Sequence, residues 1–232
     1  MEKLTNKIVF ITGATSGIGK ACAFSFAEQG ANLILCARRF ELLKEVEKEI
    51  IEKFNVKVYS FKLDVRNHND VINTISEFPV EWKEIDILIN NAGLGRNFSP
   101  LYLDNMDGWE EMIDTNVKGV LYVTREVIPL MIKHGAGHII NLGSIAGHEA
   151  YPNGAVYCAT KFAVAAITKS MRAELVDKNI RVSTVDPGMV ENCHPETGYS
   201  LFRLVFSGEV TQSDFQSLLW VPYLDSEIIY HK

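Results

Sequence analysis

A tyrosine and a lysine stand four residues apart in the segment Tyr157-Cys158-Ala159-Thr160-Lys161. In a helix, positions i and i+4 share one face, so the lysine ammonium lies near the phenol. A free tyrosine has a pKa of about 10, and an adjacent positive charge favours the phenolate and lowers that pKa. Tyr157 is therefore a candidate acid/base that exchanges a proton with an alcohol or carbonyl oxygen. The alternative for such a pair is a packing contact with the lysine at the surface.

A serine upstream of the tyrosine is the third candidate catalytic residue. Ser144 follows the apolar segment His138–Leu142 after a single glycine. A hydroxyl at the carboxyl end of a central strand points into the crevice where doubly wound folds bind ligands. We therefore expect Ser144 to steady the reacting oxygen.

A glycine-rich turn, Thr12-Gly13-Ala14-Thr15-Ser16-Gly17-Ile18-Gly19, joins the first apolar segment to the first helical one. Its glycines let the backbone turn tightly and approach a ligand, and the helix N-terminus offers free N–H groups and partial positive charge. This strand–turn–helix context is the one that dinucleotide binding requires. The turn therefore predicts a pyrophosphate site with contacts from Gly13, Thr15, Ser16, Gly17, Ile18 and Gly19.

Two arginines, Arg38 and Arg39, follow the second apolar segment, and no carboxylate stands at its end. In the dinucleotide fold an acidic residue in this region binds the ribose of NAD, whereas arginine accommodates the extra phosphate of NADP. Guanidinium groups match phosphate geometry well. The pair therefore favours NADP, with solvated surface charge as the alternative.

These residues need a scaffold, and the pattern of apolar residues predicts an α/β, doubly wound parallel sheet. Six apolar runs, typical of strands buried on both faces, cover Ile8–Thr12, Asn32–Ala37, Lys57–Leu63, Ile85–Asn90, His138–Leu142 and Arg181–Val185. Segments with helical periodicity alternate with them at Gly17–Gln29, Phe40–Phe54, Asn67–Phe78, Trp109–His134 and Ala155–Asp177. We expect one dinucleotide-binding (Rossmann) domain over 1–232, with residues 189–232 forming a substrate loop and an atypical tail.

Composition restricts the partners and the compartment. The 232 residues carry a net charge of −6 with a pI of about 5.6, so the field of the chain repels nucleic acid. No apolar run reaches the ~20 residues that span a bilayer. Four cysteines without paired spacing and a polar N-terminus favour a cytoplasmic location. The histidines show no metal-ligand spacing, so we expect no metal.

Together these residues resemble the short-chain dehydrogenase/reductase family. The resemblance rests on the glycine-rich turn, Asn90-Asn91-Ala92-Gly93, Asn116, Ser144, Tyr157 with Lys161, and Asp186-Pro187-Gly188. It implies that Tyr157 is the acid/base, that Ser144 binds the substrate oxygen, and that Lys161 lowers the tyrosine pKa and binds the nicotinamide ribose. It further implies that Asn116 kinks its helix and holds a water of a proton relay. Cofactor contacts are implied for Asp64, Val65, Asn90, Ala92, Gly93, Tyr157, Pro187, Gly188 and Val190.

Longer stretches are similar to the NADP-dependent 3-hydroxy acid (serine) dehydrogenases of that family, notably Pro79–Leu94, Trp109–Gly119 and Gly137–Lys161. The resemblance implies oxidation of small 3-hydroxy acids such as serine, allo-threonine or 3-hydroxypropionate, or reduction of the corresponding semialdehydes. A substrate carboxylate requires a cation or convergent donors, for which Arg96 and Arg203 are the candidates. For Arg96 a solvent-facing loop charge is an equal alternative.

The C-terminal part departs from the family pattern. The threonine expected to hold the nicotinamide amide after Pro187-Gly188 is replaced by Asn192, or is Thr197 after an insertion. The Gly-rich final strand of the family is not evident, and losing it exposes a sheet edge. Alternative functions are a 3-oxoacyl-thioester or broad carbonyl reductase, or an NADP(H)-binding protein with little turnover. We expect a homo-oligomer, a tetramer or dimer, as in the family.

Overall fold

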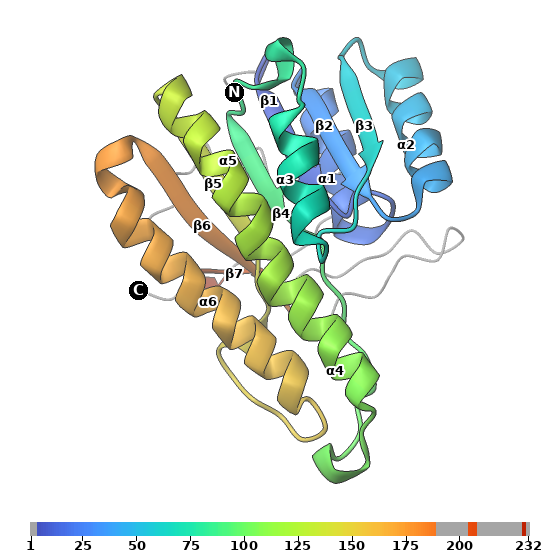
Figure 1. The fold of residues 1–232 in the computed structure, drawn as a ribbon, viewed down its shortest axis with the longest axis vertical. Coiled ribbons are helices and arrows are strands. Elements are labelled where there is room, and N and C mark those ends of the chain that lie inside the picture. Colours follow the sequence, from blue (N-terminus) through green and yellow to red (C-terminus); the bar gives the residue numbers. More distant parts are fainter. Residues whose placement is uncertain (1–3, 189–203, 208–228, 231–232) are drawn as a thin grey trace.

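The computed structural model describes residues 4–188, 204–207 and 229–230. One eight-stranded sheet runs through the molecule, with helices on both faces (Figure 1). Its strands are β1 (Ile8–Thr12), β2 (Asn32–Ala37), β3 (Val58–Lys62), β4 (Ile87–Asn90), β5 (Gly137–Leu142), β6 (Ile180–Pro187), β7 (Leu204–Ser207) and β8 (Ile229–Tyr230). The six strands expected from the sequence are all present, so the doubly wound fold is confirmed.

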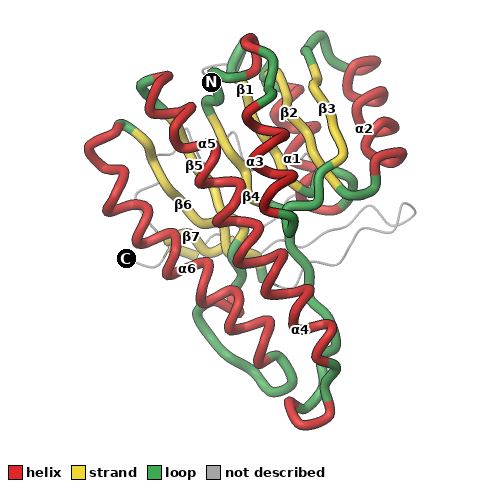
Figure 2. Tube along the Cα trace, viewed as in Figure 1, coloured by secondary structure: helices red, strands yellow, loops and turns green. Residues whose placement is uncertain are grey.

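Helices follow the strands in alternation (Figure 2). The α-helices are α1 (Gly17–Glu28), α2 (Phe40–Lys53), α3 (His68–Ser76), α4 (Met106–Ile113), α5 (Val120–His134) and α6 (Ala155–Leu175). Short turns of 3-10 helix lie at Val80–Trp82, Leu101–Leu103, Ile145–Gly147 and Val176–Lys178, and a π-helical turn, η3, spans Asp114–Gly119. Among the described residues no helix combines the length and apolar character needed to cross a bilayer.

The strand order is β3-β2-β1-β4-β5-β6-β7-β8, and the first six strands are parallel. The order therefore reverses between β1 and β4, which leaves a crevice beyond their carboxyl ends. Strand β7 pairs antiparallel with β6. The expected exposed edge is thus covered at β6, although the sequence of the tail gave no sign of a strand there.

The core consists of two apolar layers, because successive side chains of a buried strand point to opposite faces. In β1, Ile8 and Phe10 belong to the layer under α3, α5 and α6, whereas Val9 and Ile11 belong to the layer under α1 and α2. Figure 1 shows α3, α5 and α6 across the face turned towards the reader. Burial on both faces explains why these strands are continuous apolar runs.

The predicted helix Trp109–His134 is interrupted in the structure. It begins earlier, at Met106, and η3 separates α4 from α5. Single π turns of this kind occur often at functional sites, and η3 carries Asn116, which is 1% exposed. The sequence indicated one helix because its apolar spacing continues through this region without a glycine or proline that breaks it before Gly119.

Candidate active site

A cavity of about 1530 Å³ lies at the carboxyl ends of the central strands. Most residues predicted for cofactor and substrate line it, namely Gly13, Thr15, Ser16, Gly17, Ile18, Arg38, Arg39, Asp64, Val65, Ala92, Gly93, Arg96, Ser144, Tyr157, Lys161, Pro187 and Gly188. Four other residues of the sequence analysis, Val190, Asn192, Thr197 and Arg203, lie outside the described residues.

The glycine-rich turn is fixed to the loop after β4. The Thr12 hydroxyl accepts hydrogen bonds from the backbone N–H groups of Asn91 (3.1 Å) and Ala92 (3.0 Å). The Asn91 amide in turn donates to the carbonyl oxygens of Thr12 (2.8 Å) and Gly13 (3.0 Å). These four bonds join the end of β1 to the loop after β4 at the reversal of the sheet order, and so fix the base of the cavity.

At two positions of the turn, sterics explain why the residue is glycine. Gly13 has a φ of 69°, and a Cβ there would lie 2.9 Å from the Cα of Ala92. A Cβ on Gly19 would overlap the Asn91 side chain and the Gly13 carbonyl oxygen. Gly19 does not line the cavity. The structure therefore places it in the packing of α1 against the strand ends, and the cofactor contact expected of it stays a prediction.

Hydroxyl and guanidinium groups converge beside this turn. Arg39 donates through Nη2 to Thr15 Oγ1 at 2.8 Å and to Ser16 Oγ at 2.9 Å. A guanidinium and two hydroxyls form a donor set that suits a phosphate. Arg39 is thus hydrogen-bonded to the turn, although the residue is exposed.

The serine and tyrosine of the predicted catalytic set face the same cavity. Ser144 caps the 3-10 turn after β5, and its Oγ accepts the Ala146 N–H at 3.2 Å while its own N–H donates to Asp186 at 3.1 Å. Burial raises the pKa of Tyr157, and a hydrogen bond with Ser144 lowers it by less. The pKa of Tyr157 is therefore raised overall, and its lowering by Lys161 stays a prediction.

Lys161 is a buried ammonium one helical turn after Tyr157 in α6, and only 7% of the residue is exposed. Its Nζ donates to the carbonyl oxygen of Leu142 at 2.8 Å and lies 5.8 Å from the centre of the Tyr157 ring. Burial lowers the pKa of Lys161 to about 8, although nearby Asp186 raises it. The lysine is thus inside the site, not at the surface.

Asn116 holds the loop that follows β4. Its amide nitrogen donates to the Leu94 carbonyl oxygen at 2.8 Å and to Thr160 Oγ1 at 3.1 Å, while its oxygen accepts the Leu94 N–H at 2.9 Å. A Cβ on Gly93 would lie 3.2 Å from Asn116 Oδ1 and 3.8 Å from Lys161 Nζ. Gly93 therefore lies close to both Asn116 and the lysine, and Asn116 does not itself line the cavity.

Asn90, predicted to line the adenosine half, has its side chain in the interior. Its amide donates to Thr124 Oγ1 at 2.8 Å and to Asn141 Oδ1 at 2.9 Å, and the residue is 3% exposed. The neighbouring Asn91 lines the cavity. Two adjacent asparagines point to opposite faces at a strand end, so the motif alone did not show which one reaches the ligand.

The structure adds contacts that the sequence did not show. Thr115 lines the cavity, and its buried Oγ1 has no hydrogen-bond partner among the described residues. Asp186 is 2% exposed and binds both the Ser144 N–H and, at 3.1 Å, His148 Nε2. Phe98 packs edge-on against Tyr157, with the ring centres 5.8 Å apart. Only their positions in three dimensions reveal these contacts.

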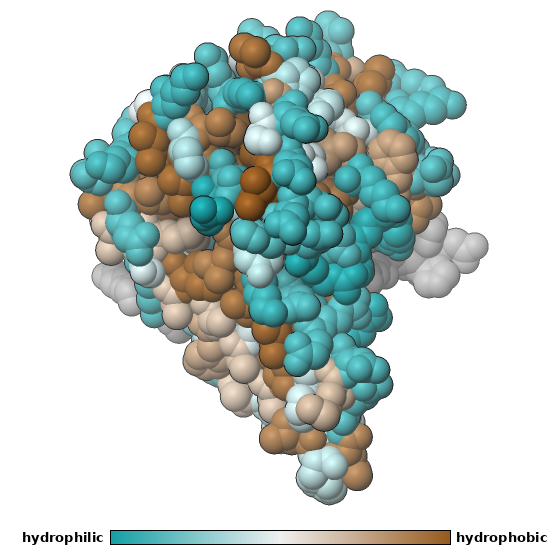
Figure 3. All heavy atoms as spheres, viewed as in Figure 1, coloured by the Kyte–Doolittle hydropathy of each residue, from teal (hydrophilic) through white to brown (hydrophobic). Residues whose placement is uncertain are grey.

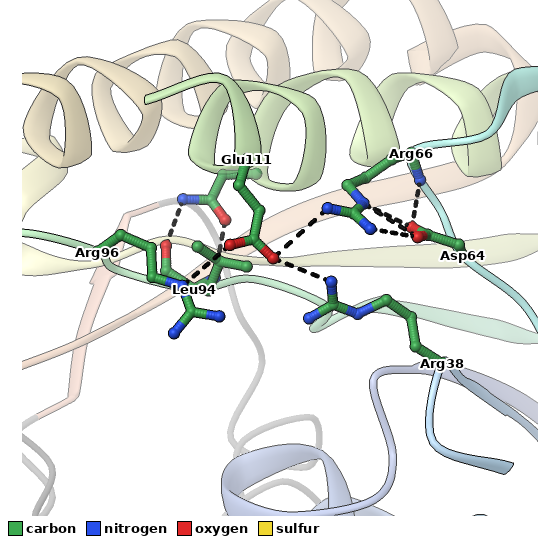
Figure 4. A network of polar contacts seen from close by, with 7 residues as sticks. Arg38, Asp64, Arg66, Leu94, Arg96 and Glu111 are labelled. Atoms are coloured by element: carbon green, nitrogen blue, oxygen red, sulfur yellow. Dashed lines mark hydrogen bonds and ion pairs between the residues drawn. The ribbon is translucent and has the colours of Figure 1, made fainter. Parts of the chain in front are cut away.

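An ion-pair network connects two ends of the cavity lining (Figure 4). Glu111 in α4 binds Arg38 at 3.0 Å, Arg96 at 3.0 Å and Arg66 at 3.4 Å. Arg66 also binds Asp64, with a shortest contact of 2.6 Å. Burial raises the pKa of Asp64, but its bonds with Arg66 outweigh that effect, so the pKa is lowered overall. The carboxylates of Asp64 and Glu111 are therefore ionised at neutral pH.

A glycine-rich turn at a sheet reversal, followed by a serine, a tyrosine and a buried lysine around one cavity, defines a dinucleotide-dependent oxidoreductase site of the short-chain type. The model of the short chain dehydrogenase family matches residues 7–196. The chain belongs to this family, as its motifs predicted.

Several relatives within the family are named as NADP-dependent 3-hydroxy acid dehydrogenases or serine dehydrogenases. The chain is 43% identical over 215 residues to an NADP-dependent 3-hydroxy acid dehydrogenase of Schizosaccharomyces pombe, covering 92% of this chain and 80% of the relative. A protein of the same name from Escherichia coli (strain K12) is 42% identical over 183 residues, covering 79% and 72%. The solved structure of a serine dehydrogenase complexed with NADP+ superposes with a TM-score of 0.75 at 41% identity, covering 78% and 72%.

The variant Lys161→Met tests the cost of burying the ammonium. The folded-state pKa of about 8 lies below the unfolded value of about 10.4, so the unfolded chain binds more protons between these values and stability rises with pH. Methionine removes this titration. We expect the stability advantage of Lys161→Met over the wild type to shrink by roughly 3 kcal/mol between about pH 7 and 10.5. Urea titrations across this range measure it, and a constant difference contradicts the buried charge.

Proposed function

We propose that the protein is an NADP-dependent oxidoreductase that transfers a hydride between nicotinamide C4 and C3 of small 3-hydroxy acids, with Tyr157 as acid/base. The observation that carries this proposal is one cavity lined by the glycine-rich turn and by Ser144, Tyr157 and Lys161. The names of the relatives support the cofactor and the class of substrate. Serine, allo-threonine and 3-hydroxypropionate with their semialdehydes are the proposed substrates.

The residues around the cavity fit a dinucleotide with a 2′-phosphate. Arg39, Thr15 and Ser16 supply convergent donors, and Arg38 lines the same end. The unpartnered Thr115 hydroxyl and the remaining N–H groups of Lys161 offer partners for ribose hydroxyls. When bound, NADP supplies the hydride or accepts it. Asp64, Val65, Ala92, Gly93, Pro187 and Gly188 complete the proposed cofactor contacts.

The proton of the substrate hydroxyl is assigned to Tyr157. Ser144 hydrogen-bonds the phenol and lowers its pKa, so it favours the phenolate that accepts this proton during oxidation. In the reverse direction the raised pKa of Tyr157 keeps the phenol protonated and able to donate to the carbonyl oxygen. Lys161, held by Leu142 and facing Asp186, contributes positive charge near this proton. Asn116 positions the loop that lies over the lysine.

The size and the charge of the residues around the Tyr157 end of the cavity favour a small anionic substrate. Phe98 packs on Tyr157, so it narrows the space in front of the phenol. Arg96 lines the cavity and is our candidate for the substrate carboxylate. A carboxylate and a guanidinium form a strong bidentate pair. Arg203, the other candidate, stays a prediction.

A homo-oligomer and a cytoplasmic location also stay predictions. Exposed apolar side chains on α5 and α6 favour assembly, because large apolar residues at the surface mark contact sites. Leu121 is 42% exposed, Ile132 44% and Phe162 43%. Figure 3 shows brown and tan surface over the lower half of this face.

A substrate panel tests the proposed function. Purified protein is assayed with NADP and NAD against serine, allo-threonine and 3-hydroxypropionate, and with NADPH against malonic semialdehyde, 3-oxoacyl thioesters and simple ketones. We expect the highest kcat/KM for a small 3-hydroxy acid or its semialdehyde. Fast thioester reduction without turnover of hydroxy acids identifies the alternative reductase. NADPH binding without any turnover identifies a binding protein instead.

The variant Tyr157→Phe removes the acid/base and keeps the ring that packs against Phe98. We expect kcat to fall by at least about 10²-fold, the lower range for a positioned acid/base, while the Kd for NADPH changes little. Stopped-flow absorbance at the nicotinamide band and fluorescence titration measure the two quantities. Equal turnover by the variant contradicts the assigned role of Tyr157.

The variant Arg38→Ala tests the phosphate end of the cavity. Loss of a charge-assisted partner of the 2′-phosphate is expected to weaken NADPH by about tenfold or more, in the range of hydrogen bonds to charged groups, with little change for NADH. Calorimetric titration with both cofactors provides the comparison. If NADH weakens as much as NADPH, Arg38 does not bind the phosphate.

A further inference from the structure

Glu111, to which the proposed function assigns no role, is the centre of a charge cluster. Its Oε1 lies 3.0 Å from Arg38 Nη1 and 3.4 Å from Arg66 Nη1, and its Oε2 lies 3.0 Å from Arg96 Nε. The side chain is 22% exposed. Figure 4 shows the carboxylate between the three guanidinium groups, with Arg38 and Arg96 approaching it from separate segments.

The two carboxylates of this cluster have different main partners among the arginines. Asp64 binds Arg66 through Nε (2.9 and 3.0 Å) and Nη2 (2.6 Å), so Arg66 already has a close counter-ion. Among the described residues, Glu111 is the carboxylate that neutralises Arg38 and Arg96. The bonds with Arg96 and then Arg38 lower the pKa of Glu111, so the group carries its charge at neutral pH.

A 2′-phosphate bound to Arg38 would therefore meet an anion that already binds this guanidinium. Like charges at such distances repel, and a partly exposed site screens that repulsion incompletely. Either the Arg38 side chain leaves Glu111 or the phosphate shares it, and both cost binding energy. NADH carries no 2′-phosphate and does not compete.

We propose that Glu111 is an internal counter-ion that competes with the 2′-phosphate of the cofactor for Arg38 and so reduces the preference of this protein for NADP over NAD. The inference rests on the proposed function, because it assumes that Arg38 binds the phosphate. It adds that the selectivity of the site depends on a carboxylate from α4 as well as on the arginines after β2. Glu111 is thus a specificity-determining residue that acts through Arg38.

The experiment measures cofactor binding, independently of turnover. Kd values for NADPH, NADH and adenosine 2′,5′-bisphosphate are determined by calorimetry for the wild type, Glu111→Gln, Arg38→Ala and the double variant. Glu110→Gln is the matched control, because it removes the same charge from the adjacent, exposed position of α4. Thermal unfolding of each variant verifies that it is folded.

We expect Glu111→Gln to tighten NADPH and adenosine 2′,5′-bisphosphate by about two- to fivefold, the range of a partly exposed ion pair. Binding of NADH should stay the same. The gain should vanish in the Arg38→Ala background, since the competition needs both partners. Glu110→Gln should change NADPH binding by less than about 1.5-fold, because Glu110 is exposed and has no ion pair within the described part of the chain, so solvent screens its charge.

Three results overturn the inference. The first is weaker NADPH binding by Glu111→Gln, which makes Glu111 a support of Arg38 rather than a competitor. The second is an unchanged NADPH Kd. The third is an equal gain in the Arg38→Ala background or with Glu110→Gln, which is a general charge effect. Arg38→Ala separates the two proposals. If Arg38→Ala weakens the binding of NADPH alone and Glu111→Gln leaves the NADPH Kd unchanged, only the counter-ion role of Glu111 is refuted. If Arg38→Ala weakens the binding of NADPH and NADH equally, the phosphate role of Arg38 is refuted.

Discussion

The hydrogen bonds between the ends of β1 and β4 are the constraint on which the rest of the site depends. A parallel sheet whose strand order reverses leaves a crevice, but the crevice binds a ligand only if its two sides keep a fixed separation. The Thr12 hydroxyl and the Asn91 amide fix it through four hydrogen bonds with partly buried backbone groups. Glycine is required at position 13 because this contact brings the backbone of Ala92 within 2.9 Å of a Cβ.

The candidate catalytic site places charged groups in the interior, where the fold otherwise buries apolar side chains. Lys161 and Asp186 are both buried, and each is tolerated because it has partners: Leu142 for the ammonium, Ser144 and His148 for the carboxylate. Burial lowers the pKa of Lys161 while the Asp186 carboxylate raises it, so the protonation of the site depends on more than Tyr157. The α6 helix and the end of β6 are therefore coupled electrostatically as well as by packing.

Most of the fold could be predicted from the sequence, because parallel strands buried on both faces leave a strong apolar signal. Strands β1 and β2 begin and end at the predicted residues. Features that depend on distant contacts could not be predicted in this way. Asn90 and Asn91 are the same residue type in one motif, and only the packing of β4 decides that Asn90 binds Thr124 and Asn141 in the interior. The π turn around Asn116 and the β7 pairing likewise depend on partners far along the chain.

The sequence shows which residues are charged, but not which partners these charges have in the fold. From the sequence, Arg38 and Arg96 are cations at two places, one near a phosphate and one near a substrate carboxylate. In the structure one carboxylate binds both, so neither is a free cation of full strength. A guanidinium that is already paired with a carboxylate binds a ligand anion less strongly, because the anion must displace the carboxylate or share the guanidinium with it. Cofactor preference in such a site is therefore decided by the balance of charges around the arginine, and helix α4, which carries no part of the dinucleotide motif, contributes to that balance.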